Sequence, residues 1–329
     1  VSGVEFIAAN TDAQALAASS AHNIIQIGET GLGAGMKPQV GRQLAEESRA
    51  RIEDSLRGAH MVFIAAGMGG GTGTGAAPIV AEIAKSMGAL TVAVVSKPFS
   101  YEGQKCMDIA EEGLEALSQH VDSLIIILNE KLEDIYEDES MLDWMKHADD
   151  VLNNAVAGIA EIINVPGHIN VDFNDVKTIM GEQGKAMMGT ATASGVDRAR
   201  IAAEQAVASP LLDGIDLSGA RGVLVNVTAS RGLKGKEIKE VMAAVRAFAA
   251  PDASIAQGIA YDDNMGDDIR VTVVATGLGK AKKAMQLVQT PMLRTGTHNA
   301  PMMASGGMGH ASAGVTMGSA AGVGGAMDG

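Results

Sequence analysis

"MVFIAAGMGGGTGTG", residues 61–75, joins a short apolar run to a loop with six glycines and two threonines in nine positions. A glycine-rich turn between a buried strand and a helix presents backbone N–H groups to an anion, and glycine lets a phosphate approach the main chain closely. The alternative is a tight turn with close packing, for which one or two glycines would be enough. The number of glycines therefore predicts a phosphate-binding loop.

Two common phosphate-binding motifs do not fit this loop. A Walker A loop ends in Gly-Lys-Ser/Thr, whereas Gly75 is followed by two alanines. A dinucleotide fingerprint can be aligned from Gly71 to Ala76, but the next strand runs into Ser96-Lys97 and lacks the acidic residue that would hold a ribose. An NAD-dependent dehydrogenase is thus an alternative for which no hydride-transfer acid or base is evident.

The first half of the chain alternates between buried strands and helical patterns. Its short runs rich in Val and Ile are too uniformly apolar for a half-exposed sheet and are typical of parallel strands covered on both faces. These runs span residues 4–8, 61–66, 90–95 and 121–128, and the helical patterns span 39–57, 76–87 and 104–119. The alternation predicts a doubly wound, Rossmann-like α/β sheet.

The second half predicts a separate unit. A long helical pattern over 143–163 stops at Pro166-Gly167, and a helix, a strand, a helix and two strands follow between 184 and 277, which indicates a smaller α+β domain. Residues 295–329 are almost wholly Gly, Ala, Met, Ser and Thr, a composition typical of a flexible tail. We divide the chain into a nucleotide-binding domain (1–142), a connecting helix (143–165), a second domain (166–279) and a low-complexity tail (280–329).

Composition restricts the partners and the compartment. A formal net charge of −14 and a pI near 4.9 favour repulsion from nucleic acid and anionic lipid. No apolar stretch approaches the roughly 20 residues of a membrane span, and the N-terminus lacks a signal-peptide pattern. One cysteine and seven histidines without ligand spacing indicate neither a disulfide framework nor a zinc site. We expect a cytoplasmic protein with no nucleic-acid partner, no direct membrane insertion and no metal site of its own.

The glycine loop and several other motifs occur together in one known family. They are "NTDAQAL" (10–16), "GLGAG" (31–35), "GGGTGTG" (69–75), "DDVLNNAVAGIAEII" (149–163) and "NVDFNDVKTIM" (170–180). Over roughly residues 1–279 the chain resembles the FtsZ family of bacterial cell-division GTPases, within the tubulin/FtsZ superfamily. The resemblance implies GTP and GDP as ligands, head-to-tail filaments of the chain itself, other cell-division proteins as partners, and a place in the mid-cell division ring.

The resemblance also implies which residues contact GTP. Guanine offers an N1–H and an amino group to a carboxylate, a donor pair that adenine lacks. The corresponding residues are Gly70, Gly71, Thr72 and Gly73 for the phosphates, Ala34 and Gly35 beside the terminal phosphate, Glu102 for the ribose, and Asn129 and Asp150 for the base. From the residues alone, without the resemblance, the favoured interpretation of Asp150 is a solvated helix carboxylate paired with Lys146. Mg²⁺ would accompany the nucleotide and be held mainly by its phosphates.

A second constellation lies in "NVDFNDV". Asp172 and Asp175 stand three residues apart at the start of a predicted helix, where the residues alone predict an N-cap and a first-turn carboxylate. In the family this loop inserts over the GTP of the next subunit, and the two aspartates polarise the attacking water and help to place a cation. Asn170 belongs to the same loop and would orient it. The resemblance thus implies that hydrolysis is complete only in a filament, because phosphoryl transfer depends on positioning and charge stabilisation.

The chain departs from the family at several positions. The family's first strand and its glycine-rich phosphate loop would lie before Val1, and its C-terminal tether peptide is not seen, so we expect both ends to be truncated. Cys106 replaces an arginine near the nucleotide, and Met145 replaces an aromatic residue that stacks on guanine. Lys37 replaces an asparagine, and it either donates to the terminal phosphate or points to solvent. The departures support an alternative hypothesis, an assembly-incompetent fragment with impaired nucleotide binding.

Overall fold

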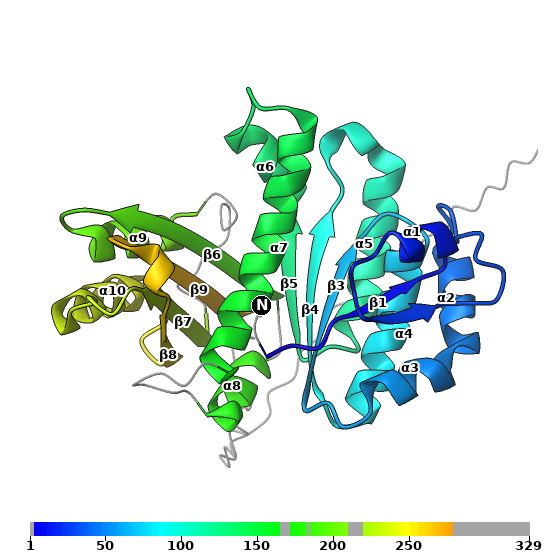
Figure 1. The fold of residues 1–329 in the computed structure, drawn as a ribbon, viewed down its shortest axis with the longest axis horizontal. Coiled ribbons are helices and arrows are strands. Elements are labelled where there is room, and N and C mark those ends of the chain that lie inside the picture. Colours follow the sequence, from blue (N-terminus) through cyan, green and yellow to red (C-terminus); the bar gives the residue numbers. More distant parts are fainter. Residues whose placement is uncertain (1–2, 165–171, 183–184, 210–219, 279–329) are drawn as a thin grey trace, which may run out of the picture. The chain divides into compact units, whose positions relative to one another are not determined.

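The structure, a computed structural model, describes residues 3–164, 172–182, 185–209 and 220–278 (Figure 1). The strands of the first half of the chain pair in parallel. A small pair, β1 (Ile7–Asn10) and β2 (Asn23–Gln26), is followed by three strands that pair in parallel as one end of a seven-stranded sheet: β3 (Met61–Gly67), β4 (Leu90–Lys97) and β5 (Ser123–Leu128). The predicted doubly wound parallel architecture is confirmed.

Helices cover both faces of β4 and β5 and one face of β3. The helices of this half are α1 (Ala13–Ala17), α2 (Pro38–Glu47), α3 (Arg49–Leu56), α4 (Thr72–Ser86), α5 (Gln104–Ser118), α6 (Asn129–Ile135) and α7 (Met141–Asn164), with a short 3-10 turn, η1 (Ser100–Glu102). Small and branched side chains of α4 and α5 pack on one face, among them Ala81 and Leu117. On the other face Ile159 of α7 is completely buried against β4 and β5. Burial on both faces explains why β4 and β5 are apolar throughout, whereas one face of β3 is only partly buried.

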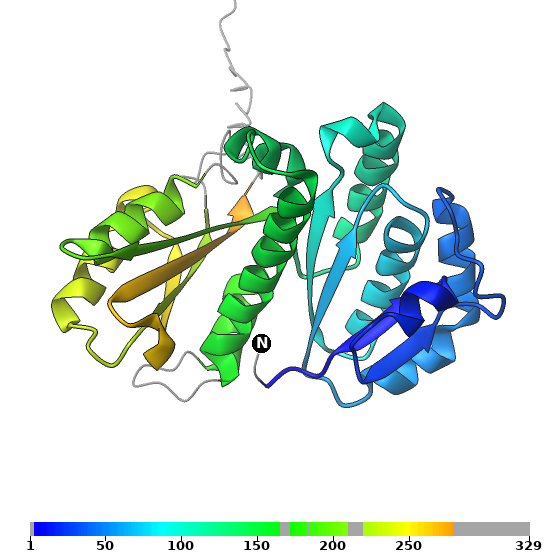
Figure 2. The ribbon, with the colours of Figure 1, turned by 45° about the horizontal axis from the view of Figure 1, so that its top comes forward.

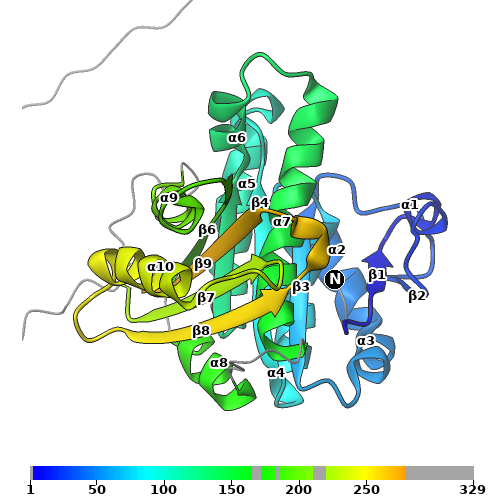
Figure 3. The same ribbon diagram turned by 60° about the vertical axis from the view of Figure 1, so that its left-hand side comes forward.

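The second half adds four strands to the same sheet (Figure 3). Its elements are α8 (Phe173–Met180), β6 (Lys185–Ser194), α9 (Arg198–Val207), β7 (Gly222–Ala229), α10 (Gly235–Phe248), β8 (Ser254–Tyr261), the 3-10 turn η4 (Asp263–Met265) and β9 (Asp268–Leu278). The strand order is β3-β4-β5-β6-β9-β7-β8, in which β6 is parallel to β5 and antiparallel to β9. Helices α9 and α10 bury one face of β7 and β9, and α7 contacts strands of both halves (Figure 2).

Two local predictions are wrong. The pattern over 39–57 is not one helix, because the chain leaves helical geometry at Ser48, whose buried hydroxyl accepts a hydrogen bond from the N–H of Gly28 at 2.9 Å. This side chain gives the backbone an alternative to a continuous helix. Helix α4 begins at Thr72 instead of Ala76, so the last residues of the glycine-rich stretch are already helical. Strand β6 was not predicted, since "KAMMGTATAS" contains no valine or isoleucine.

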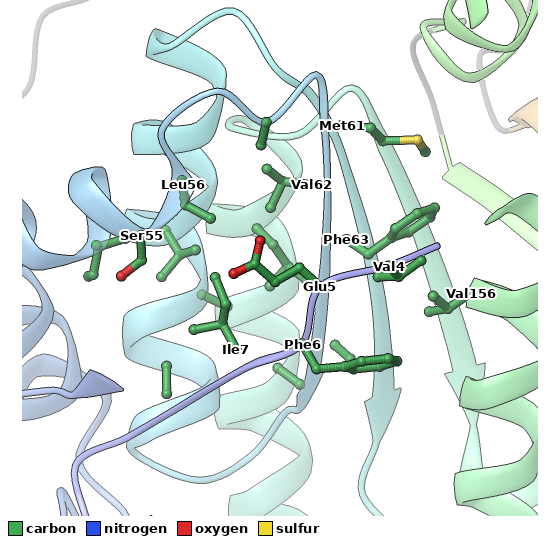
Figure 4. A pocket seen from close by; sticks show the side chains of 18 of the residues that line it. Val4, Glu5, Phe6, Ile7, Ser55, Leu56, Met61, Val62, Phe63 and Val156 are labelled. Atoms are coloured by element: carbon green, nitrogen blue, oxygen red, sulfur yellow. The ribbon is translucent and has the colours of Figure 1, made fainter. Parts of the chain in front are cut away.

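An apolar cavity of about 810 Å³ lies between the two-stranded sheet and β3 (Figure 4). Phe6 and Ile7 line one side, and Val62 and Phe63 line the other. Strands β1 and β3 do not pair with each other, since β1 bonds only β2 and β3 bonds only β4 among the described strands. The cavity extends to Thr72 and Gly73, so it is continuous with the start of α4.

Candidate functional site

Three loops meet where β3 ends and α4 begins. We call residues 67–75 the glycine loop and residues 28–37 the second loop. The N–H of Gly71 donates to the carbonyl oxygen of Gly35 at 2.7 Å, which joins these two loops. The hydroxyl of Thr72 lies 2.6 Å from that of Thr11, which follows β1. Parallel strands place their carboxyl ends at one edge of a sheet, and in doubly wound folds ligands bind at that edge.

Packing within the protein accounts for four of the six glycines. A Cβ on Gly71, Gly73 or Gly75 would lie between 2.0 and 2.4 Å from a backbone carbonyl oxygen of a neighbouring segment. Gly69 has a φ of 107°, a conformation that side chains rarely adopt. The expectation that one or two glycines would be enough for packing is wrong, because the loop is pressed against several backbone carbonyls at once.

Gly70 is different. It is exposed, its φ lies outside the left-handed region, and a Cβ built on it would meet no atom within 4 Å. The protein itself therefore does not need glycine at this position. The open space leaves room for a group that approaches the main chain from solvent, and the adjoining N-terminus of α4 offers backbone N–H groups that favour an anion.

The second loop is shaped to contact the glycine loop. Gly28, Gly31, Gly33 and Gly35 all have positive φ values between 56° and 82°. Ala34 is buried, and its Cβ would be 2.9 Å from a Cβ on Gly71, whereas Gly35 is exposed. The structure thus places Ala34 and Gly35 in contact with Gly71. These three residues were all expected near the phosphates.

The residues expected at the ribose and the base lie on the same edge of the sheet. Glu102, in η1 beyond β4, is exposed and accepts a hydrogen bond from the N–H of Phe99 at 2.9 Å. Asn129 directly follows β5 and is 6% exposed, and its buried Oδ1 has no hydrogen-bond partner in the described protein. A buried amide oxygen without a partner is costly, so Asn129 has an acceptor to offer to a ligand.

Asp150 is exposed on the first half of α7 and makes no hydrogen bond or ion pair with the described residues. Lys146, its expected partner, instead bonds Asp143 at 2.9 Å. Hydrogen bonds from Ser140 and Lys146 hold the pKa of Asp143 below its usual range. The alternative of an Asp150–Lys146 pair is therefore wrong, and the carboxylate of Asp150 is available to another donor.

The aspartates of the second constellation lie apart from the glycine loop. Asp172 is the N-cap of α8, and its Oδ1 accepts a hydrogen bond from the N–H of Asp175 at 2.8 Å, which confirms the capping prediction. Both side chains are exposed, whereas Asn170 lies outside the described residues. Helix α7 starts beyond the carboxyl end of β5 and runs 24 residues, about 36 Å, to the opposite edge, where α8 lies (Figure 2).

Phe99 and Trp144 form a small aromatic cluster next to Met145. The ring of Trp144 stacks on that of Phe99 with centroids 6.3 Å apart, and its indole N–H donates to the carbonyl of Tyr136 at 2.7 Å. Met145 is 43% exposed beside it. Cys106 is buried in α5, and its carbonyl oxygen lies 3.1 Å from the Cβ position of Gly69. We did not anticipate the cluster or the Thr11 contact, because neither has a spacing signal in the sequence.

Among the described residues, no group of three or more His, Cys, Asp or Glu side chains is placed to hold a metal ion. No helix in the part of the chain that the structure describes is long and apolar enough to cross a membrane.

Comparison with known proteins assigns the family. Residues 1–137 match the model of the Tubulin/FtsZ family GTPase domain, and residues 184–279 match that of the FtsZ family C-terminal domain. The chain belongs to the FtsZ family. The family carries guanine-nucleotide binding and GTP hydrolysis in cell division, and it places the glycine loop in the GTPase domain.

Individual FtsZ proteins are similar over most of their length. The cell division protein FtsZ of Coxiella burnetii is 56% identical over 283 residues, which cover 85% of this chain and 73% of the relative. That of Pseudomonas putida is 54% identical over 297 residues, covering 89% and 75%. A solved empty FtsZ dimer of M. jannaschii superposes with a TM-score of 0.81 at 45% identity and covers 84% of this chain and 81% of that chain.

Proposed function

We propose that this protein is a polymerising GTPase of the bacterial cell-division ring, in which each active site is completed by a neighbouring copy. GTP binds at the glycine loop, and Asp172, Asp175 and Asn170 of the next subunit complete hydrolysis. One observation carries the proposal. The glycine loop and the aspartates of α8 lie at opposite ends of α7, so one chain does not bring them together, whereas head-to-tail stacking does.

The glycine loop fits a triphosphate. Gly70 leaves the main chain open to solvent beside the N-terminus of α4, where backbone N–H groups and the helix dipole favour negative charge. The unpartnered Oδ1 of Asn129 accepts from the base, and the free carboxylate of Asp150 accepts from the N1–H and amino group of guanine. Mg²⁺ accompanies the nucleotide and neutralises phosphate charge when it is bound.

The aspartates supply acceptors for the attacking water. The Oδ1 of Asp172 is occupied by the capping bond, which fixes the orientation of the carboxylate and leaves Oδ2 exposed. Asp175 sits in the first turn of α8. Two carboxylates held at one helix end orient a water molecule and accept its proton as it attacks. Delivered by a neighbour, they make GTP turnover depend on contact between copies.

The cellular setting follows from the family and is part of the same proposal. The protein works in the cytoplasm at mid-cell, with other cell-division proteins as partners. We also retain the division into a GTPase domain (1–142), a connecting helix (143–165), a second domain with the catalytic loop at its start (166–279) and a tail (280–329).

A mixing experiment tests the proposal. Asp150→Ala removes the base contact and keeps the aspartates of α8, whereas Asp175→Ala keeps the nucleotide site and removes a catalytic group. Each variant alone should hydrolyse GTP at least about 100-fold more slowly than the wild-type chain, as expected for loss of a positioned acid–base group or of substrate binding. An equal mixture should recover part of the wild-type activity, because one of the four possible kinds of contact then pairs an intact nucleotide site with intact aspartates.

Control measurements distinguish a loss of hydrolysis between copies from a general loss of folding or of GTP binding. Glu112→Ala removes an exposed carboxylate from α5 and should leave the rate unchanged. Asp175→Ala should still bind GTP at wild-type affinity, and the specific activity of the wild-type chain should rise steeply with protein concentration. Equal specific activity at all dilutions, together with a mixture no faster than its parents, would refute hydrolysis between copies.

A further inference from the structure

A polar cluster lies where α7 contacts the strands of the second half. The carboxylate of Glu161, in the last turns of α7, accepts hydrogen bonds at Oε2 from the Nδ2 of Asn226 at 3.1 Å and from the hydroxyl of Thr228 at 3.3 Å. The guanidinium of Arg270 lies 3.7 Å from Oε1 of the same carboxylate. Asn226 and Thr228 belong to β7, and Arg270 belongs to β9, where it pairs with Thr228. One side chain of α7 thus contacts two strands at once.

The cluster is set into an apolar interface. Ile159 and Ile162 of α7 are buried in the same core as Leu224 of β7. Apolar contacts are largely non-directional, whereas hydrogen bonds to a carboxylate require defined distances and angles. Asn226 is buried, so a shift of α7 would leave its amide without the acceptor that Glu161 provides, and such a loss is costly. The cluster therefore opposes any shift of α7 along the second-half strands.

The aspartates of α8 are carried by these strands. Helix α8 packs against β7 and β8, and the carbonyl oxygen of Ile179 accepts a hydrogen bond from the hydroxyl of Thr276 in β9 at 2.8 Å. The carboxylate expected at the base, Asp150, lies about 16 Å from Glu161 along the axis of α7. Glu161 therefore joins the helix that carries the base contact to the strands that carry the aspartates.

We propose that Glu161 is a positioning residue for hydrolysis between copies. It holds the aspartates of α8 at a fixed place relative to the nucleotide site of the same chain. In a stack of identical copies, this placement decides where the aspartates meet the GTP of the next copy. The inference rests on the proposed function, since it names a residue that acts on the same reaction without contacting the substrate.

Steady-state kinetics at saturating GTP test the inference on the assembled full chain. Glu161→Ala should lower kcat at least about tenfold, because a small misplacement of a reacting group is costly, and should leave the affinity for GDP within about twofold of the wild-type value. Glu161→Gln keeps an acceptor oxygen and should retain most of the rate. Thr228→Val removes one hydrogen bond to Glu161 and should give an intermediate rate, which supplies a second measure if Glu161→Ala does not fold.

Glu237→Ala is the matched control. It also breaks a partly buried contact between a carboxylate and a guanidinium, but this one joins α10 to Arg198 of α9. The variant should unfold at a lower urea concentration than the wild-type chain and keep its kcat. A loss of stability is thereby separated from a loss of position. A wild-type kcat in Glu161→Ala, or an equal loss of kcat in Glu237→Ala, would overturn the role of Glu161.

A distance measurement supplies a readout that stability alone does not move. Spin labels are attached to Glu112→Cys in α5 and Lys177→Cys in α8, both exposed positions, in a Cys106→Ala chain diluted below the concentration at which it assembles. Glu161→Ala should shift or broaden the distribution of distances between the labels, whereas Glu237→Ala should leave it unchanged. An unchanged distribution in Glu161→Ala would also overturn the inference.

Failure of the proposed function gives a different result. In that case the specific activity of the wild-type chain does not rise with protein concentration, whatever residue occupies position 161. The distance distribution then still shows whether Glu161 holds α8 in place.

Discussion

The substitution Gly70→Ala tests whether the glycine at this position serves ligand binding or packing within the protein. In the structure the new methyl group meets no protein atom within 4 Å, and the residue is exposed with a φ that alanine can adopt. Replacing glycine under these conditions restricts the unfolded chain, so the free energy of unfolding should rise by about 0.4–1 kcal/mol or stay unchanged. A phosphate that approaches the main chain would meet this methyl group, and relieving such a clash costs about 1–3 kcal/mol, or roughly 10–100-fold in nucleotide affinity.

The assay pairs urea unfolding with a GDP titration of the same variant. Gly58→Ala is the matched control, because it also has open space around its Cβ but has a φ of 82°. It should lose about 1–2 kcal/mol of stability from the left-handed backbone and keep wild-type affinity for GDP. A Gly70→Ala chain that binds GDP as tightly as the wild-type chain would show that the glycine loop serves packing alone.

Other substitutions test the fold and its pH dependence. Gly75→Ala places a methyl group 2.0 Å from the carbonyl oxygen of Pro38, so a loss of about 3 kcal/mol or more and of GDP binding is expected by urea unfolding and titration; wild-type stability would contradict the close contact. Ile159→Ala, at a completely buried position between α7 and the sheet, should cost about 3 kcal/mol in the same unfolding assay, and a cost below about 1 kcal/mol would contradict its place in the core. A hydrogen bond from the guanidinium of Arg198, at 2.7 Å, holds the pKa of Glu237 below its ordinary value of 4.5. The folded state therefore gains stability above that pH and loses it as the pH falls through the lowered pKa. Glu237→Gln should be about 2 kcal/mol less stable than the wild-type chain at pH 7, and the difference should shrink in unfolding curves measured below pH 4.5, whereas a gap independent of pH would contradict the ion pair.

Several parts of the fold could be predicted because they depend on local patterns. Uniformly apolar runs such as 90–95 indicate strands covered on both faces, and β4 lies there with both faces buried. The pattern 143–163 corresponds to α7, whose length and buried face follow from helical periodicity. Strand β6 could not be found in this way, because its small residues carry little β-propensity and it is held by pairing with β9 along its length.

The candidate site shows the same division. Glycines in the loop are visible in the sequence, but the reason for each is not. Gly71 and Gly75 face backbone carbonyls of Gly35 and Pro38, which are distant in sequence, and Gly73 faces that of Gly67 in the same loop, whereas Gly70 is exposed with open space around it. In the same way, Lys146 stands one helical turn before Asp150 in the sequence, but in the structure it forms its ion pair with Asp143. A contact depends on side-chain direction as well as on spacing.

The sequence by itself determined the fold class, the family and the position of the glycine loop, because these follow from hydrophobic periodicity and from motifs in a fixed order. Only the tertiary structure decided that Gly70 has open space around it, that Asn129 has a buried acceptor without a partner among the described residues, and that the aspartates of α8 lie at the far end of α7 from the glycine loop. The physical reason is that these facts arise from the packing of segments remote in the chain, and a local pattern carries no information about which neighbours it will meet.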